Sequence, residues 1–330
     1  MQLQTTYMGL KLENPIMAGA CPLTKNLDRV KEMEEAGIAG IVLPSLFEEE
    51  ISYDQHAMDK FLNYSTNAVS AEAITFFPEP ENFHNFEGEE YLESLRKIKS
   101  CVGIPVIGSL NGTTPGGWVK YAKLIQEAGA DALELNIFYV PTDVSQSGSE
   151  VEKRYVEILK LIKAQVTIPV AVKMSPFFSS IANMAKRFDE AGANGLVLFN
   201  RFLEPDFDLD NLEASMRPSY STRHEMRLPL HWTAILNGSI KASIAASRGI
   251  KSGTDILKLI MAGADATMIS SLFYQEGIGS AAKLIKEMIQ WMEEHEYTSI
   301  EQMKGSMSFR HIPDKSAFQR ANYMKQLRSI

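Results

Sequence analysis

A lysine near the end of an apolar run is the first sign of chemistry in this chain. Lys173 lies within the run Pro169–Met174. A lysine on a buried strand costs several kcal/mol unless its charge has a partner. Two functions fit: a cation beside a bound anionic group, or an amine of depressed pKa that forms a Schiff base. An internal salt bridge is the weaker interpretation, because charges at strand ends usually face a ligand.

Two asparagines end neighbouring apolar runs of the same kind. Asn136 ends the run that begins at Ala132, and Asn200 ends the run that begins at Gly195. An amide offers a donor and an acceptor together, which suits a flat heterocycle that presents both. One such asparagine would more often form a turn. Two of them beside Lys173 favour a site for a planar ligand.

A repeated helix stop outlines the elements that must position these side chains. Ala-Gly pairs begin at Ala36, Ala128, Ala191 and Ala262, each after a helix-like stretch and before a short apolar run. Glycine tolerates the left-handed conformation that ends a helix, so the run after each pair reads as a buried strand. Repeated helix, stop and strand predict a parallel sheet covered by helices, with function at the carboxyl ends of the strands.

The strand candidates number eight, and amphipathic stretches with apolar residues three and four apart lie between them. They are Asn14–Ala20, Gly40–Ser45, Pro105–Leu110, Ala132–Asn136, Pro169–Met174, Gly195–Asn200, Ser243–Ser247 and Ala266–Ser270. In 330 residues this pattern predicts an α/β fold, a single-domain (β/α)8 TIM barrel. A doubly wound open sheet is disfavoured, because no Gly-x-Gly-x-x-Gly follows the first strand.

Three segments interrupt or extend the repeat. Insertions at about 47–87 and 201–230 follow the second and sixth strands, so we expect both on the catalytic rim of the barrel. A helical tail occupies about 278–330, and the sequence leaves open whether it packs under the barrel or serves an oligomer interface.

Two loops near the end of the chain indicate a phosphate site. Ser247–Gly253 follows the seventh strand, and Ile269–Leu272 opens the helix after the eighth. In (β/α)8 enzymes these loops commonly hold a phosphate on backbone N–H groups. Gly249 would allow close backbone approach, and Ser270 and Ser271 would add hydroxyl donors. Ordinary turn and cap chemistry explains the serines but not the placement of both loops.

The bulk composition excludes several classes of protein. A net charge of −8 and a pI of about 5.4 disfavour nucleic acid and anionic membranes as partners. Cys21 and Cys101 make neither a disulfide framework nor a metal-ligand spacing, and no metal spacing is found among His56, His84, His224 and His231. Neither a signal peptide nor an apolar run of roughly 20 residues is present. We therefore expect a cytoplasmic protein with a small-molecule substrate and no metal.

With these residues assembled, the chain resembles the dihydroorotate dehydrogenase family, whose members are FMN-containing (β/α)8 barrels. The resemblance covers roughly residues 5–290, and only the ordered set of motifs is specific. The motifs are Asn14–Ala20, Glu134–Asn136, Val172–Pro176, Asn200, Ser247–Gly253 and Ala262–Ala264.

The resemblance implies a role for each matched residue. The flavin would lie on Gly19, Ala20 and Ser45, with its edge facing Ser109, Asn136 and Lys173 and with Phe199 lining the pocket. Its phosphate would bind Arg248, Gly249, Ser270 and Ser271. Lys173 would stabilise the negative charge that the flavin gains when hydride reaches N5. Asn136 and Asn200 would hold the substrate over the ring.

The substrate side departs from the family pattern. Tyr139 stands where the family carries a Cys or Ser base, and a phenol, with an ordinary pKa of about 10, is more natural as an acid. Pro44 replaces a ligand-gripping lysine, and the family's asparagine-bearing loop is not recognisable in Phe76–Asn82. Arg201 is a candidate replacement clamp for a carboxylate, and a solvated loop arginine fits equally well.

The resemblance implies an FMN-dependent oxidoreductase of pyrimidine biosynthesis, with dihydroorotate to orotate as the leading reaction and another pyrimidine-like substrate as a variant. It also implies a homodimer, with fumarate or NAD as the undecided final acceptor. Two alternatives stay open. One is an aldolase-type barrel in which Lys173 forms a Schiff base, and the other is a flavin-binding protein without dehydrogenase turnover.

Overall fold

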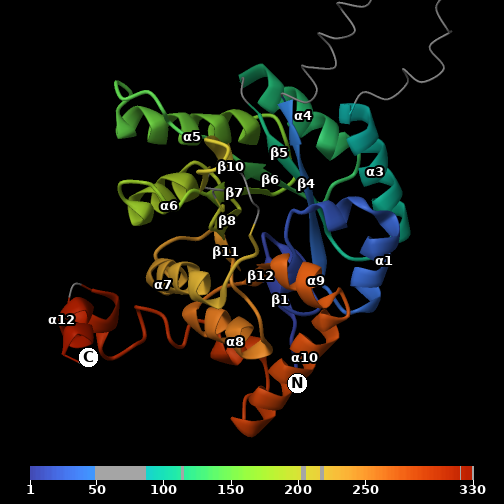
Figure 1. The fold of residues 1–330 in the computed structure, drawn as a ribbon. Helices are drawn as coiled ribbons and strands as arrows, with labels where there is room; N and C mark the ends of the chain where they lie inside the picture. Colours follow the sequence, from blue (N-terminus) through green and yellow to red (C-terminus); the bar gives the residue numbers. More distant parts are fainter. Residues whose placement is uncertain (49–86, 113–114, 202–205, 216–218, 320, 329–330) are drawn as a thin grey trace, which may run out of the picture.

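Eight parallel strands close into a barrel at the centre of the molecule (Figure 1). The structure is a computed structural model that describes residues 1–48, 87–112, 115–201, 206–215, 219–319 and 321–328. Around the barrel the strands are β3 (Ile16–Ala18), β4 (Gly40–Phe47), β5 (Val106–Asn111), β6 (Ala132–Asn136), β7 (Val170–Met174), β8 (Gly195–Leu198), β11 (Ser243–Ser247) and β12 (Ala266–Ile269). Each contains the centre of one predicted strand, so the predicted (β/α)8 barrel is confirmed.

One long helix follows each strand and packs on the outside of the barrel (Figure 1). These helices are α1 (Leu27–Glu35), α3 (Glu87–Cys101), α4 (Pro115–Glu127), α5 (Gly148–Lys163), α6 (Ile181–Glu190), α7 (Arg227–Leu236), α8 (Gly253–Ala262) and α10 (Ser280–Glu294). The sequence placed α10 in the tail, but its apolar face, with Leu284, Met288 and Met292, is buried beside α8. It is therefore the eighth helix of the barrel.

The predicted helix stops adopt the left-handed conformation that glycine permits. Gly37, Gly129 and Gly192 have φ values of +87°, +95° and +93°, and Gly263 has +116°. Gly37 and Gly192 directly follow a C-terminal alanine cap, and Gly263 is itself the cap of α8. The stops direct each following strand back into the sheet, as predicted.

A short hairpin that the sequence analysis did not predict closes the barrel at the amino ends of its strands. It consists of β1 (Thr5–Tyr7) and β2 (Leu10–Leu12). The Met8 backbone N–H donates to Ser243 Oγ at the start of β11. Tyr7 and Leu12 are buried among the inward-facing side chains of the barrel. Because this hairpin covers the amino ends of the strands, the carboxyl ends form the open end of the barrel.

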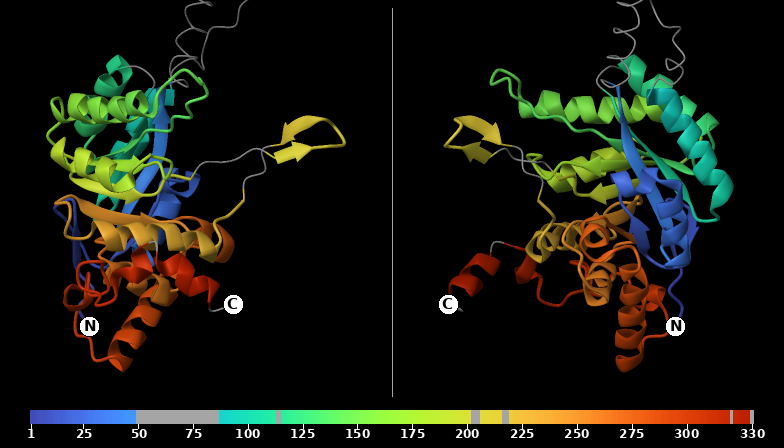
Figure 2. Two further views of the ribbon diagram at one scale, coloured as in Figure 1. Left: turned by 90° about the vertical axis from the view of Figure 1, so that its left-hand side faces the viewer. Right: turned by 45° about the vertical axis from the view of Figure 1, so that its right-hand side comes forward.

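The insertions and the tail lie outside this framework. Residues 49–86 of the first insertion, with the loop Phe76–Asn82, lie outside the described residues. The second insertion holds the hairpin β9 (Asp206–Asp208) and β10 (Glu213–Ser215), which extends away from the barrel (Figure 2). It then holds η3 (Arg223–Met226), and α7 begins inside the predicted range.

Part of the tail packs against the barrel helices. Beyond α10 come α11 (Ile300–Met303), η4 (Lys315–Phe318) and α12 (Ala321–Leu327). Ile300 and Met303 are buried, and Phe309 N donates to Ala234 O of α7 at 2.9 Å. Within the described part of the chain, no helix combines the length and apolar composition needed to cross a membrane.

Candidate active site

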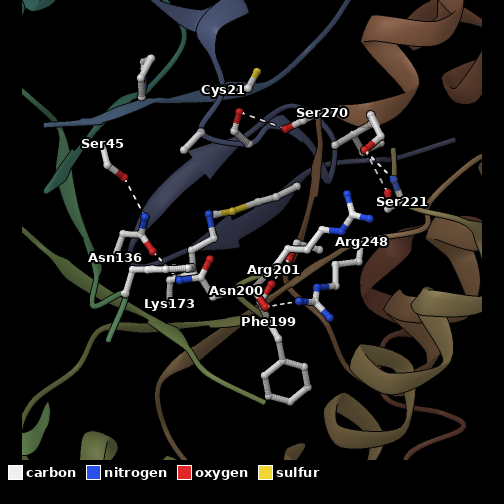
Figure 3. A pocket seen from close by; sticks show the side chains of 18 of the residues that line it. Cys21, Ser45, Asn136, Lys173, Phe199, Asn200, Arg201, Ser221, Arg248 and Ser270 are labelled. Atoms are coloured by element: carbon white, nitrogen blue, oxygen red, sulfur yellow. Dashed lines mark hydrogen bonds between the residues drawn. The ribbon is translucent and has the colours of Figure 1, made fainter. Parts of the chain in front are cut away.

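A cavity of about 640 Å³ opens at the carboxyl ends of the barrel strands (Figure 3). Its volume lies within the usual range for small-molecule sites. All the predicted site residues except Ser109 and Tyr139 line it. These lining residues are Gly19, Ala20, Ser45, Asn136, Lys173, Phe199, Asn200, Arg201, Arg248, Gly249, Ser270 and Ser271. The barrel therefore brings together residues as far apart in the sequence as Gly19 and Ser271.

Lys173 lines the cavity and also forms an ion pair inside the barrel. Its Nζ lies 3.3 Å from Oε1 of Glu134, and the two side chains are 14% and 0% exposed. The parallel register of β6 and β7 pairs Asn136 with Lys173, so Glu134 lies one inward-facing position deeper. The salt bridge that the sequence ranked as the weaker interpretation is present. The amine that a Schiff base would need is therefore engaged with a carboxylate.

A chain of hydrogen bonds fixes the two asparagines. Asn200 Nδ2 donates to Asn136 Oδ1 at 2.6 Å, and Asn136 Nδ2 donates to Ser45 Oγ at 2.9 Å. Ser45 Oγ lies 2.8 Å from Ser109 Oγ. Ser109 is fully buried behind Ser45, so its contact is with Ser45 and not with the cavity. These bonds orient both amide groups before any ligand binds.

Hydroxyl and backbone donors gather at the other end of the cavity, where the two predicted phosphate loops meet. Ser221 Oγ lies 3.0 Å from Ser271 Oγ and accepts a hydrogen bond from Gly249 N at 3.2 Å. Ser270 Oγ donates to Gly19 O at 3.2 Å. The sequence analysis missed Ser221, since it lies in a polar insertion without a motif that would single it out.

Two arginines lie between the amides and the serines (Figure 3). Arg248 donates to the carbonyl oxygen of Asn200 and has a left-handed φ of +81°. Arg201 Nε lies 3.4 Å from Glu225 Oε1, and its guanidinium also donates to Ser219. Arg201 therefore reaches the cavity edge already paired with a carboxylate, and its side chain is 29% exposed.

Two predicted site residues point elsewhere. The Tyr139 hydroxyl donates to Gln146 Oε1 at 2.8 Å, the Arg154 guanidinium lies 4.8 Å from its ring centroid, and Phe138 lines the cavity instead. An acid or base role for Tyr139 stays a prediction, one that requires this loop to move. Phe199 lines the cavity, but its ring points away from the polar side chains in Figure 3 and is buried in a core cluster that includes residues of the surrounding helices.

Cys21 lines the cavity as an inert thiol. Burial raises its pKa, an effect that hydrogen bonds from Ser270 and backbone groups only partly offset. A thiol that stays protonated is a poor nucleophile. The described residues contain no group of three or more His, Cys, Asp or Glu side chains placed to hold a metal ion.

Comparison with known proteins shows which proteins this chain is similar to. No protein-family model matches the chain. It is 27% identical over 308 residues to the dihydroorotate dehydrogenase B (NAD(+)) catalytic subunit of Thermoplasma volcanium, across 92% of this chain and 97% of that protein. The Pyrococcus abyssi subunit of the same name is 26% identical over 315 residues, with 92% and 98% covered. These likenesses, over about nine-tenths of the chain, support a divergent member of the dihydroorotate dehydrogenase family.

A relative with another substrate in its name matches over a similar length. The NAD-dependent dihydropyrimidine dehydrogenase subunit PreA of Escherichia coli is 23% identical over 335 residues, across 94% of this chain and 78% of that protein. Pro44, which stands where the family resemblance implies a lysine, lines the cavity.

Proposed function

We propose that this protein is an FMN-dependent oxidoreductase that oxidises or reduces a CH–CH bond in a small planar pyrimidine-like substrate. Dihydroorotate to orotate is the leading reaction. The observation that carries the proposal is Lys173, an ammonium at the cavity floor beside the oriented amides of Asn136 and Asn200. The names of the relatives, which are dehydrogenases of dihydroorotate and of dihydropyrimidines, support it.

The residues present fit FMN at both ends of the cavity. Lys173 supplies a cation at one end, where a flavin gains negative charge on reduction. Arg248, Gly249 and Ser271 supply charged, backbone and hydroxyl donors at the other, where a phosphate would bind. At Gly19 a Cβ would lie 3.0 Å from Ser270 Oγ, so the first loop has no room for a side chain there.

The chain's own residues would bind and orient the reactants. FMN, when bound, supplies the two-electron acceptor. Asn136 and Asn200 would pair with the amide-like edge of the substrate, because their mutual hydrogen bond leaves further donor and acceptor capacity. Arg201 would bind a substrate carboxylate. Among the described lining residues there is no carboxylate, imidazole or phenol, so Tyr139 would serve as acid or base only after a loop movement.

An anaerobic titration tests the proposal. Purified protein should bind FMN and turn yellow, and dihydroorotate or a related dihydropyrimidine should bleach the colour without oxygen. Lys173→Met is the matched control, expected to slow bleaching strongly. Bleaching by an uncharged dihydropyrimidine alone would change the proposed substrate. A yellow protein that no dihydropyrimidine bleaches would indicate flavin binding without this turnover, and failure to bind FMN would contradict the proposal.

We also propose that the chain forms one domain and a homodimer. Phe207, Leu209 and Leu212 on the β9–β10 hairpin are 73%, 80% and 86% exposed, on an arm that extends from the barrel (Figure 2). Such exposed apolar side chains favour a protein partner. Light scattering after gel filtration should give twice the chain mass of 36.8 kDa, and a monomer would contradict the homodimer.

A further inference from the structure

Glu134 is a buried carboxylate to which the proposed function gives no task. Its side chain is 0% exposed on β6, inside the barrel. Oε1 contacts Lys173, but Oε2 has no hydrogen-bond partner among the described residues. A carboxylate taken out of water is costly unless a charge partner and hydrogen bonds compensate it. Lys173 is the partner that the structure provides, so the two charges depend on one another.

The surroundings of Glu134 offer no second cation in the described structure. Its register partners on β5 and β7 are Ser109 and Ala171, which carry no charge. The phenols of Tyr7 and Tyr91 are the titratable groups near it. Burial raises the pKa of both, and the negative charge of Glu134 raises it further. Both stay neutral, so among the residues that the structure describes Lys173 is the cation that balances the carboxylate.

This pairing has a consequence for any anion that binds at the cavity floor. An ammonium that already faces a carboxylate attracts a second negative group less strongly than an isolated ammonium does. The same carboxylate holds Nζ near the barrel axis, since it lies one inward-facing position below Lys173. Glu134 therefore affects both where the positive charge lies and how much of it a ligand experiences.

We propose that Glu134 is a positioning residue that holds the Lys173 ammonium at the cavity floor and limits the stabilisation this ammonium gives to negative charge on a bound group. The redox part of this proposal, the effect on negative charge of a bound group, rests on the proposed function, because that group would be a flavin. The structural part, in which the charges of Glu134 and Lys173 depend on one another, does not rest on it.

A double-mutant cycle on the protein without cofactor tests the structural part. Glu134→Gln and Lys173→Met should each lower the urea midpoint of unfolding, because each leaves a buried charge without its partner. The double variant should lose less than the sum of the two. If Glu134→Gln does not fold alone, its rescue by Lys173→Met supports the pair equally. Additive losses, or a double variant that is also unfolded, would overturn the pair.

The reduction potential of bound FMN tests the redox part. Glu134→Gln should shift the potential upward, since removing the carboxylate strengthens the ammonium's effect on the reduced flavin. Lys173→Met should shift it downward. A purely structural role would not produce opposite shifts. An unchanged or lower potential in Glu134→Gln would overturn this part. If the wild type binds no FMN, the proposed function fails while the cycle still decides the pair.

Discussion

The hydroxyl of Tyr139 makes its hydrogen bond outside the cavity, so we expect it to contribute little to the rate of flavin reduction. Because it donates to Gln146 at 2.8 Å and does not line the cavity, Tyr139→Phe should lower flavin reduction by less than about tenfold. A group that transfers a proton in the reaction typically contributes about 10²–10⁴-fold. Stopped-flow bleaching measures the difference, with Lys173→Met as the impaired control. A hundredfold loss would mean that the loop brings the phenol to the substrate.

A second prediction for a single residue is that Arg201 distinguishes charged from uncharged substrates. Arg201→Ala should weaken binding of dihydroorotate by about tenfold or more, since a hydrogen bond to a charged group contributes about 1.5–3 kcal/mol. Binding of an uncharged dihydropyrimidine should change little. Glu225→Gln is the matched control, because it removes the competing carboxylate 3.4 Å away and should tighten dihydroorotate binding. Equal effects on both substrates in Arg201→Ala would contradict the clamp.

At the scale of elements, the β1–β2 hairpin stabilises the barrel through apolar burial. The Tyr7 hydroxyl is buried and has no hydrogen-bond partner among the described residues. Tyr7→Phe should therefore leave the free energy of unfolding unchanged or raise it, because a buried unpaired polar group is unfavourable. Leu12→Ala, the control at 1% exposure, should lower it by about 2–5 kcal/mol. A clear loss in Tyr7→Phe would reveal a polar partner for the hydroxyl.

A second prediction at the scale of elements concerns the left-handed glycines that end the helices. At Gly129 no atom lies within 4 Å of an added Cβ, so Gly129→Ala should cost about 1–2 kcal/mol from the left-handed conformation alone. At Gly263 the added Cβ would lie 2.3 Å from Asn237 Nδ2, so Gly263→Ala should cost more. Urea unfolding measures both. Equal losses would mean that Asn237 moves aside freely.

For the whole molecule, a histidine links the C-terminal segment to the barrel in a pH-dependent way. His231 of α7 stacks on Phe318, with ring centroids 5.5 Å apart, and burial lowers its pKa. The unfolded chain therefore binds the proton more readily than the folded one. The contribution of His231 to the free energy of unfolding is complete above the ordinary histidine pKa and is lost as the pH falls below it. Between about pH 7.5 and 5.5 the C-terminal segment should become more sensitive to protease.

His231→Phe is the matched control for this prediction. It keeps an aromatic ring against Phe318 and removes the titrating group, so the protease sensitivity of the segment should lose its pH dependence. If acid increases the protease sensitivity of the wild type and of the variant equally, another group controls the segment.

Local signals in the sequence determined the barrel. A left-handed glycine and the apolar run after it need only neighbouring residues, so the helix stops and the eight strands could be predicted, as could Lys173 at a strand end. The β1–β2 hairpin was missed because its three-residue strands are too short to show a period.

Contacts between distant residues belong to the tertiary structure alone. Glu134 and Lys173 are 39 residues apart, and their pairing depends on strand register, which no local pattern encodes. Ser221 joins the serine cluster across 50 residues for the same reason. Local patterns were therefore enough to predict the fold and the strand ends that carry polar groups. Only the folded chain decided which of these side chains face the cavity and which, like Tyr139, turn away.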